Sequence, residues 1–272
     1  MRQVTKAEIR TARETLLPPH SIRTMEECLT AIARAGFVWP FTPGNELLPS
    51  LFPALATDDE GQRWDWMWGW KDAIAASRRA FYGKLVTGKP TFVSTEWLAV
   101  FYALTGNTGD IADDLEHAAE NVRLHDMSRK VCQYMLENGP TGTRTLQGKL
   151  TDGTPAMKKA LEKAIEQLDT LMLIAKAGTE GGASFANTWD LFSRFHPKAV
   201  DAGTAIPTRQ AAVKLLEQFF VLTPAVAERD LPKLFPWNAE HQTRAIGKLK
   251  ESGYLAPCLV EGKPGLVRAD WR

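Results

Sequence analysis

Few side chains of this sequence have the type and spacing that acid–base chemistry needs. The five histidines are scattered along the chain and form neither an HExxH helix motif nor a Ser–His–Asp arrangement. Asp65 and Asp72 stand beside a run of tryptophans, where a carboxylate can activate water as a general base. The competing interpretation for both is a surface or helix-cap role. The catalytic candidates from residue type are therefore Asp65 and Asp72 alone.

Four tryptophans alternate within RWDWMWGWKD, at positions 64, 66, 68 and 70. If this segment is a strand, every second side chain shares a face, and the four indoles lie together. Such a row can stack on nucleic-acid bases, or it can pack on helices as part of the core. We favour the core, and expect Trp64, Trp66 and Trp70 to be mostly buried.

Basic side chains gather in two regions with helical periodicity and at one turn. When such a helix approaches a nucleic-acid groove, its cations contact phosphates. The competing interpretation is a solvated helix face, because Glu162 and Glu166 share the first region with the lysines. The residues expected to bind DNA are Arg144, Lys149, Lys158, Lys159, His241, Arg244, Lys248 and Lys263.

Composition restricts the class of protein. The net charge of +1 lacks the strong basic excess of a dedicated DNA-binding domain, so any DNA surface must be a local patch. Cys28, Cys132 and Cys258 are isolated and form no CxxC pair, and the glycine-rich segments match no nucleotide fingerprint. We expect no metal and no cofactor. The charged N-terminus and the lack of an apolar run of about 18 residues predict a cytoplasmic protein without a membrane partner.

The elements that must position these cations recur in one order: helix, turn, helix, short helix or turn, then a two-strand hairpin. The last stretch shows it most clearly, with helices over residues 207–221, 225–234 and 238–252 and a hairpin over 254–267 around a turn at 261–265. Asn238 is the expected cap of the third helix, and Gly253 its end.

The middle stretch repeats the order. A helical region over 110–138 breaks near His125, and helices over 143–150 and 154–168 follow. Strands over 171–177 and 183–190 then surround a glycine-rich tip. The first stretch has a capping box at Thr24 and Glu27, a helix ended by Gly36, a second helix expected over 45–55 and a hairpin over 85–93.

Three helices followed by a hairpin form a winged helix, an elaboration of the helix-turn-helix. The sequence therefore predicts a mainly α protein with small β-hairpins, built as a tandem winged-helix array. The expected units are an N-terminal unit with the tryptophan-rich segment (1–108), a middle unit (109–203) and a C-terminal unit (204–272).

The stretches FYGKLVTGKPTFVSTEWLAVFYALTG (81–106) and GPTGTRTLQGKL (139–150), the latter followed by a helix and a hairpin, give the chain a family resemblance. In layout and weak local pattern it resembles the tandem winged-helix DNA glycosylases of the AlkZ/YcaQ type and their uncharacterised relatives. The resemblance implies a concave DNA-binding surface built from three winged helices, and metal-free removal of alkylated or crosslinked bases in active members.

The catalytic motif of that family is Gln-x-Gln or Gln-x-Asp in the first part of the chain. This sequence has its one Gln-x-Asp at Gln167-Leu168-Asp169, at the end of the middle unit's third helix, and its first unit holds only Gln3 and Gln62. The catalytic role is therefore not transferred to any residue. Two further readings stay open: a non-enzymatic winged-helix regulator of DNA, and a scaffold whose winged helices bind protein.

Overall fold

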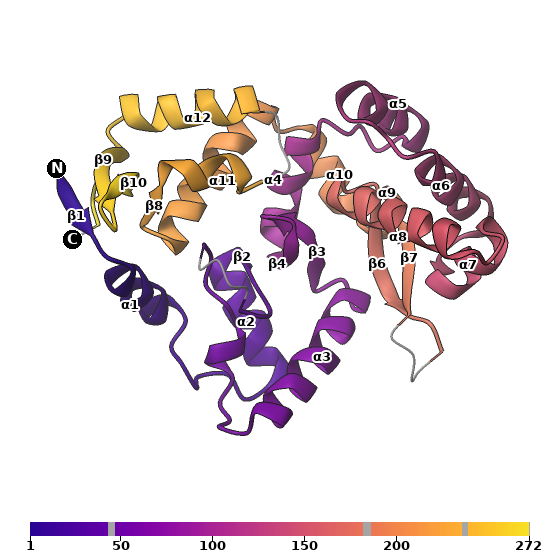
Figure 1. The fold of residues 1–272 in the computed structure, drawn as a ribbon, viewed down its shortest axis with the longest axis horizontal. Helices are drawn as coiled ribbons and strands as arrows, with labels where there is room; N and C mark the ends of the chain where they lie inside the picture. Colours follow the sequence, from indigo (N-terminus) through magenta and orange to yellow (C-terminus); the bar gives the residue numbers. More distant parts are fainter. Residues whose placement is uncertain (43–46, 182–185, 236–238, 272) are drawn as a thin grey trace.

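The computed structural model describes residues 1–42, 47–181, 186–235 and 239–271. It is mainly helical and carries small sheets, as the sequence predicts (Figure 1). Three segments share one order of elements: helix, short strand, helix or 3-10 turn, longer helix, and a hairpin. In each, the short first strand pairs with the last strand, which also pairs with the strand before it. We call these segments the first, middle and third repeats.

The first repeat begins with a helix that has the predicted capping box at Thr24 and Glu27 and ends at Gly36, whose φ of +80° suits glycine. Its hairpin turns at Thr87 and Gly88, as predicted. The elements are α2 (Met25–Ala35), β2 (Phe37–Val38), η1 (Phe52–Ala54), α3 (Glu60–Ala76), β3 (Ala80–Val86) and β4 (Lys89–Ser94).

The middle repeat follows the predicted order throughout its described residues. His125 accepts from the backbone N–H of Met127 and starts a new helix, so the predicted break near this residue is confirmed. The preceding half of the expected 110–138 region is a separate helix, α5 (Ile111–Asn121). The repeat comprises α6 (Asp126–Asn138), β5 (Thr141–Gly142), α7 (Thr143–Leu150), α8 (Pro155–Thr170), β6 (Ile174–Thr179) and β7 (Asn187–Leu191).

The third repeat contains the predicted hairpin, with Glu261 and Gly262 at its turn. A parallel strand from the N-terminus, β1 (Arg2–Val4), extends this sheet along β9. The repeat comprises α11 (Thr208–Leu222), β8 (Ala225–Ala227), η2 (Glu228–Lys233), α12 (Ala239–Glu251), β9 (Leu255–Val260) and β10 (Lys263–Arg268). Five further helices lie outside the repeats among the described residues: α1 (Lys6–Leu16), α4 (Thr95–Thr105), α5, α9 (Phe192–Phe195) and α10 (Pro197–Thr204).

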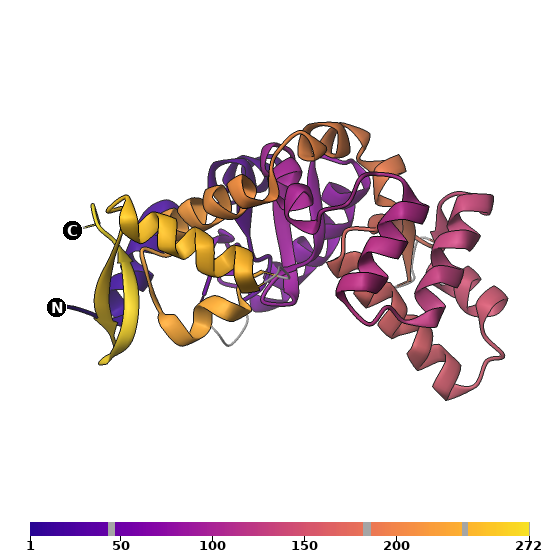
Figure 2. The same ribbon diagram turned by 90° about the horizontal axis from the view of Figure 1, so that it is seen from above.

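Apolar packing makes the first and third repeats one body. Phe37 of the first repeat packs edge-to-face on Phe101 of α4 at 5.2 Å and on Phe235 after η2 at 6.1 Å between ring centroids. The middle repeat has a core of its own around Val131, Leu168 and Ile174. Viewed from above, the middle repeat projects to one side from the end of the elongated body that the other two form (Figure 2).

The tryptophan-rich segment is a helix, so the predicted strand is wrong. Asp59 caps it by accepting from the N–H groups of Gly61 and Gln62, and 17 residues follow in helical conformation. At about 100° per residue, positions 64 and 68 share one side and positions 66 and 70 another. Trp66 and Trp70 are half-buried and stack at 5.4 Å. Trp64 is 39% exposed and Trp68 45%, so the predicted burial of Trp64 is wrong.

Two other expected α-helices are absent from the described residues, and proline residues lie in both segments. Of residues 45–55, the described part contains only η1, because Pro49 and Pro53 lack the N–H that a helix needs. The expected helix over 225–234 is strand β8, paired with β10, followed by the 3-10 helix η2 containing Pro232. The predicted cap Asn238 lies outside the described residues.

Candidate functional site

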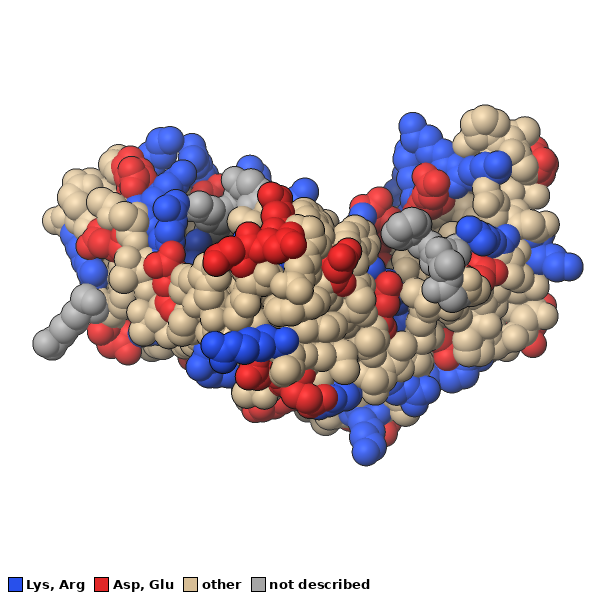
Figure 3. Space-filling view, turned by 90° about the horizontal axis from the view of Figure 1, so that it is seen from below, with Lys and Arg blue, Asp and Glu red and all other residues tan. Residues whose placement is uncertain are grey.

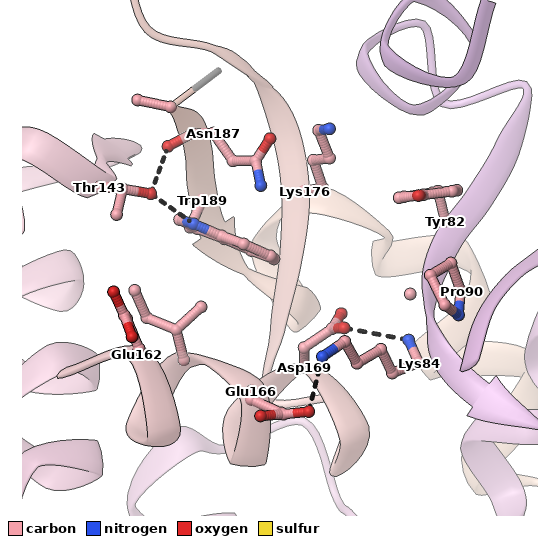
Figure 4. Close-up of a pocket in the computed structure, with 13 residues that line it drawn as sticks. Tyr82, Lys84, Pro90, Thr143, Glu162, Glu166, Asp169, Lys176, Asn187 and Trp189 are labelled. Atoms are coloured by element: carbon pink, nitrogen blue, oxygen red, sulfur yellow. Dashed lines mark hydrogen bonds and ion pairs between the residues drawn. The ribbon is translucent and has the colours of Figure 1, made fainter. Parts of the chain in front are cut away.

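A cavity of about 400 Å³ lies between the β3–β4 hairpin of the first repeat and the middle repeat (Figure 4). Strand β3 supplies one wall, while the last turns of α8 and the strands β6 and β7 supply the others. The residues that line it are Tyr82, Gly83, Lys84, Pro90, Thr143, Glu162, Ile165, Glu166, Asp169, Lys176, Ala186, Asn187 and Trp189.

Asp169 is the buried carboxyl of this cavity. It belongs to the last turn of α8 and is 5% exposed. Its Oδ2 accepts a hydrogen bond of 3.0 Å from the backbone N–H of Lys84, while its Oδ1 has no hydrogen-bond partner among the described residues. Burial raises the pKa of Asp169 to about 7, against the opposing effects of the Lys84 hydrogen bond and the charges of Lys84 and Lys176. Near neutral pH this carboxyl can therefore take up or release a proton.

Two ion-pair systems flank Asp169. On one side, Lys84 Nζ lies 2.6 Å from Glu166 Oε1 at the cavity mouth. On the other, the buried ammonium groups of Lys71 and Lys176 both bond to Asp72, with Lys71 Nζ at 2.6 Å. Of these five charged residues, the cations Lys84 and Lys176 line the cavity, and their charges stabilise negative charge there.

Two aromatic side chains, Trp189 of β7 and Tyr82 of β3, line opposite sides of the cavity, and hydrogen bonds fix the indole of Trp189. The indole N–H of Trp189 donates to Thr143 Oγ1 over 3.0 Å, and that hydroxyl donates to the backbone carbonyl of Asn187 over 2.9 Å. Tyr82 faces the cavity from β3, with Lys176 Nζ 5.3 Å from its ring centroid. The rings of Trp189 and Tyr82 lie on opposite sides of the cavity, and their flat faces suit a planar organic group such as a nucleobase.

The two carboxylates predicted as catalytic candidates lie outside this cavity. Asp65 is exposed on α3 and lines no part of it. Asp72 is half-buried next to it. Its burial acts to raise its pKa, but hydrogen bonds from Lys176 and Lys71 outweigh that effect and lower it. Asp72 is thus an ionised carboxylate held by two ammonium groups, which makes it a poor proton acceptor.

The Gln-x-Asp segment does not act as a pair. Positions 167 and 169 of a helix point in different directions, with Leu168 buried between them. Gln167 Oε1 accepts from the N–H of His125 at 2.8 Å and from Ser128 Oγ at 3.0 Å, which commits this side chain to joining α8 to α6. Asp169 alone reaches the cavity. Sequence reasoning missed it as a site residue, although a charged residue directly after the apolar position Leu168 was an available signal.

The predicted DNA-binding residues fall on two separate parts of the molecule. Arg144 and Lys149 on α7 and Lys158 and Lys159 on α8 are exposed on the middle repeat. The remaining four belong to the third repeat: Arg244, Lys248 and Lys263 are exposed and His241 is half-buried. Arg244 bonds to Glu240 one helical turn away. His241 instead lines a separate cavity of about 700 Å³ between α12, α5 and α8, together with His117 and Lys163.

The surface between these parts is hollowed. Viewed from below, Lys and Arg atoms gather toward the end formed by the third repeat and over the lobe formed by the middle repeat, and Asp and Glu atoms lie between them (Figure 3). Among the described residues, no group of His, Cys, Asp and Glu side chains is arranged to hold a metal ion, and no helix is long and apolar enough to cross a membrane. All three cysteines are buried thiols.

Comparisons with known proteins agree on one family. Residues 22–236 match the family model described as "AlkZ related". The fold is similar to that of the Streptomyces sahachiroi DNA glycosylase AlkZ, with a TM-score of 0.60 over 99% of this chain and 71% of that chain. The two sequences are 14% identical, so this likeness concerns the fold alone. No curated protein sequence matches the chain.

Proposed function

Because this chain belongs to the AlkZ-related family, we propose that it binds DNA and acts as a glycosylase-like repair protein. The solved structure with a similar fold is a DNA glycosylase, which supports the same role. In this proposal each repeat is a winged-helix unit, and the units span residues 1–108, 109–203 and 204–272. Their common order of elements and the hairpin that ends each one support this assignment.

DNA would lie across the hollow between the middle and third repeats. The third helices of these repeats, α8 and α12, carry the exposed cations Lys158, Lys159 and Lys248. Lysines dominate the cations of these two helices, and Arg244 of α12 is their one arginine. Lysines mainly contact phosphates, so binding is expected to be strongly salt-dependent and weakly sequence-selective. Acidic side chains lie between the two basic ends. They would repel the phosphates of the DNA backbone there, which would leave room for a displaced base.

The single observation that carries the chemical part of this proposal is Asp169. The cavity that it lines lies between the first and middle repeats, and Tyr82 and Trp189 contribute aromatic rings to its walls. In hydrolysis of an N-glycosidic bond, the bond from C1′ to the base breaks and the base leaves with its electrons. Ionised Asp169 would stabilise the positive charge that develops on the sugar and would accept a proton as water adds to C1′. Lys84 and Lys176 would stabilise a base that departs as an anion.

The proposal is tested with duplex DNA that carries an alkylated guanine. Released base and alkali-labile abasic sites measure excision by the unsubstituted protein, by Asp169→Asn and by Asp65→Asn. We expect excision by the first and by Asp65→Asn, and a loss of at least 100-fold in Asp169→Asn, since removing a general base costs about 10²–10⁴. Loss in Asp65→Asn with activity retained in Asp169→Asn assigns the role to Asp65. DNA binding without excision by any form favours the regulator, and absence of binding at low salt favours the protein scaffold.

A further inference from the structure

A strongly basic cavity of about 680 Å³ lies between the N-terminal helix α1 and the third repeat, apart from the Asp169 cavity. Its charged lining residues come from three segments that are distant in sequence: α1, the 3-10 helix η2 and the turn of the β9–β10 hairpin. The cations that line it are Lys6, Arg10, Arg13, Arg229, Lys233 and Lys263, and the acids are Asp230 and Glu261.

Both acids already have partners. Glu261 Oε1 accepts a 2.6 Å hydrogen bond from the backbone N–H of Lys6, at the first turn of α1. Asp230 Oδ2 lies 3.9 Å from Nε of Arg229. By contrast, the ammonium groups of Lys6, Lys233 and Lys263 have no ion-pair partner within the part of the chain that the structure describes. With six cations and two acids in its lining, the cavity carries an excess of positive charge, which favours binding of an anion.

A buried guanidinium forms the inner wall of this cavity. Arg13 is 9% exposed, and its Nε and Nη2 atoms each lie 3.3 Å from Thr223 Oγ1. That hydroxyl donates to the backbone carbonyl of Leu47 over 2.8 Å, so it accepts from Arg13 while it donates elsewhere. Thr223 thus occupies the Nε–Nη2 edge of the guanidinium and holds its positive charge in place at the inner wall of the cavity.

The N-terminal segment is held rigidly against the third repeat. Strand β1 pairs in parallel with β9 from Arg2 to Val4, and Thr5 begins α1 with a capping box. The backbone N–H of Glu261 donates to the carbonyl of Val4 over 3.0 Å. The family match begins at residue 22, so α1, which supplies three of the six cations, lies outside it.

We propose that this cavity binds phosphodiester groups of a DNA strand and forms a backbone clamp beyond the Asp169 cavity. The proposal rests on the proposed DNA-binding function and adds a contact surface to it. A DNA strand presents successive phosphates, which suits cations spread over three elements better than one small anion does. The expected contribution is independent of base sequence and decreases with salt.

The test compares two triple variants with the same loss of charge. The cavity variant carries Lys6→Gln, Lys233→Gln and Lys263→Gln, and the control carries Lys198→Gln, Arg209→Gln and Lys214→Gln, three exposed cations on α10 and α11 outside this cavity. Fluorescence anisotropy with a labelled duplex of about 24 base pairs gives the affinity from 50 to 300 mM NaCl. We expect the cavity variant to reduce the slope of log K against log salt by about 2–3, and the control by less than 1. Equal slopes for the two variants overturn the clamp.

Two further outcomes distinguish the backbone clamp from a failure of DNA binding as a whole and from a site for small anions. If the unsubstituted protein does not bind the duplex at 50 mM NaCl, the DNA-binding function and the clamp fail together; if it binds and the two variants agree, only the clamp fails. Isothermal titration with inorganic phosphate provides the second arm. Phosphate binding that the cavity variant abolishes, with no difference in DNA slope, identifies a site for small anions and overturns the backbone contact.

Discussion

The backbone N–H of Lys84 donates to Oδ2 of Asp169 over 3.0 Å, although 85 residues separate the two in sequence. This hydrogen bond joins β3 of the first repeat to the end of α8 in the middle repeat. It leaves Oδ1, a buried atom, without a hydrogen-bond partner among the described residues. The site is thus a property of the junction between two repeats, and neither repeat forms it alone.

The raised pKa of Asp169 makes stability depend on pH in a defined direction. Its pKa is about 7 in the folded protein and near 3.8 when exposed, so the folded state holds the proton more tightly. The protonated form therefore stabilises the fold at acid pH, and this contribution is lost as pH rises from about 4 to above 7. In urea unfolding at pH 8, Asp169→Asn should be more stable than the unsubstituted protein, by at most about 4 kcal/mol, since one pKa unit corresponds to about 1.4 kcal/mol. At pH 4 the difference should vanish. An equal difference at both pH values would contradict the buried, unpaired carboxyl.

Because Gly83 has no side chain, the carboxyl of Asp169 can pack directly against it. A Cβ at this position would stand 2.6 Å from Asp169 Oδ1 and 2.6 Å from the ring of Phe81, closer than atoms can approach. Gly83→Ala must therefore displace the carboxyl or the ring, and should destabilise the protein by about 1–3 kcal/mol. Gly148→Ala, on α7 with open space around its Cβ position, is the control and should be neutral or slightly stabilising. Thermal unfolding of both variants measures the difference; a neutral Gly83→Ala would mean that the junction is loose.

The sequence predicts the elements of the repeats better than it predicts the site. Capping signals at Thr24 and the hairpin turns are local, so they identify α2 and all three hairpins without reference to the rest of the chain. The alternation of tryptophans in α3 is equally local, yet it indicates a strand where the structure has a helix. The contacts of Trp64 with Phe41 and Phe52 involve residues outside the segment, so the local pattern does not contain them. The cavity around Asp169 depends on a contact 85 residues away, which no local pattern contains.

Asp72 is expected to be structural rather than catalytic. Asp72→Asn removes the carboxylate to which the buried ammonium groups of Lys71 and Lys176 both bond. Because Asp72 itself is 30% exposed, the cost should be about 2–3 kcal/mol, below the range for a fully buried pair. Burial already lowers the pKa of Lys71 to about 8, so at higher pH this side chain can lose its proton and its charge. The destabilisation by Asp72→Asn should therefore be larger at pH 6 than at pH 9, measured by urea unfolding. A cost that grows with pH would contradict this arrangement.

The tryptophans of α3 should respond differently to a soluble quencher. Trp64 and Trp68 are exposed, while Trp66 and Trp70 are half-buried and stacked on each other. Acrylamide should quench a fraction of the tryptophan emission efficiently, and the double variant Trp64→Phe, Trp68→Phe should lack most of that fraction. Trp66→Phe with Trp70→Phe is the matched control and should keep it. If both double variants quench alike, the two sides of α3 are equally exposed.

DNA affinity, if it depends on the third helices, should depend more on Lys248 than on Arg244. Both are exposed on α12, but Arg244 bonds to Glu240 and so part of its charge is already offset, whereas Lys248 has no partner among the described residues. Lys248→Glu should therefore weaken duplex binding more than Arg244→Glu, and should do so equally for unrelated sequences, since phosphates carry no sequence information. Lys158→Glu with Lys159→Glu should act in the same way from the middle repeat. Each lost phosphate contact should reduce the salt slope by about one unit in anisotropy titrations. If the α12 variants leave both affinity and slope unchanged while the α8 variants reduce them, DNA contacts the middle repeat without α12, and the hollow between the two repeats is not the binding surface.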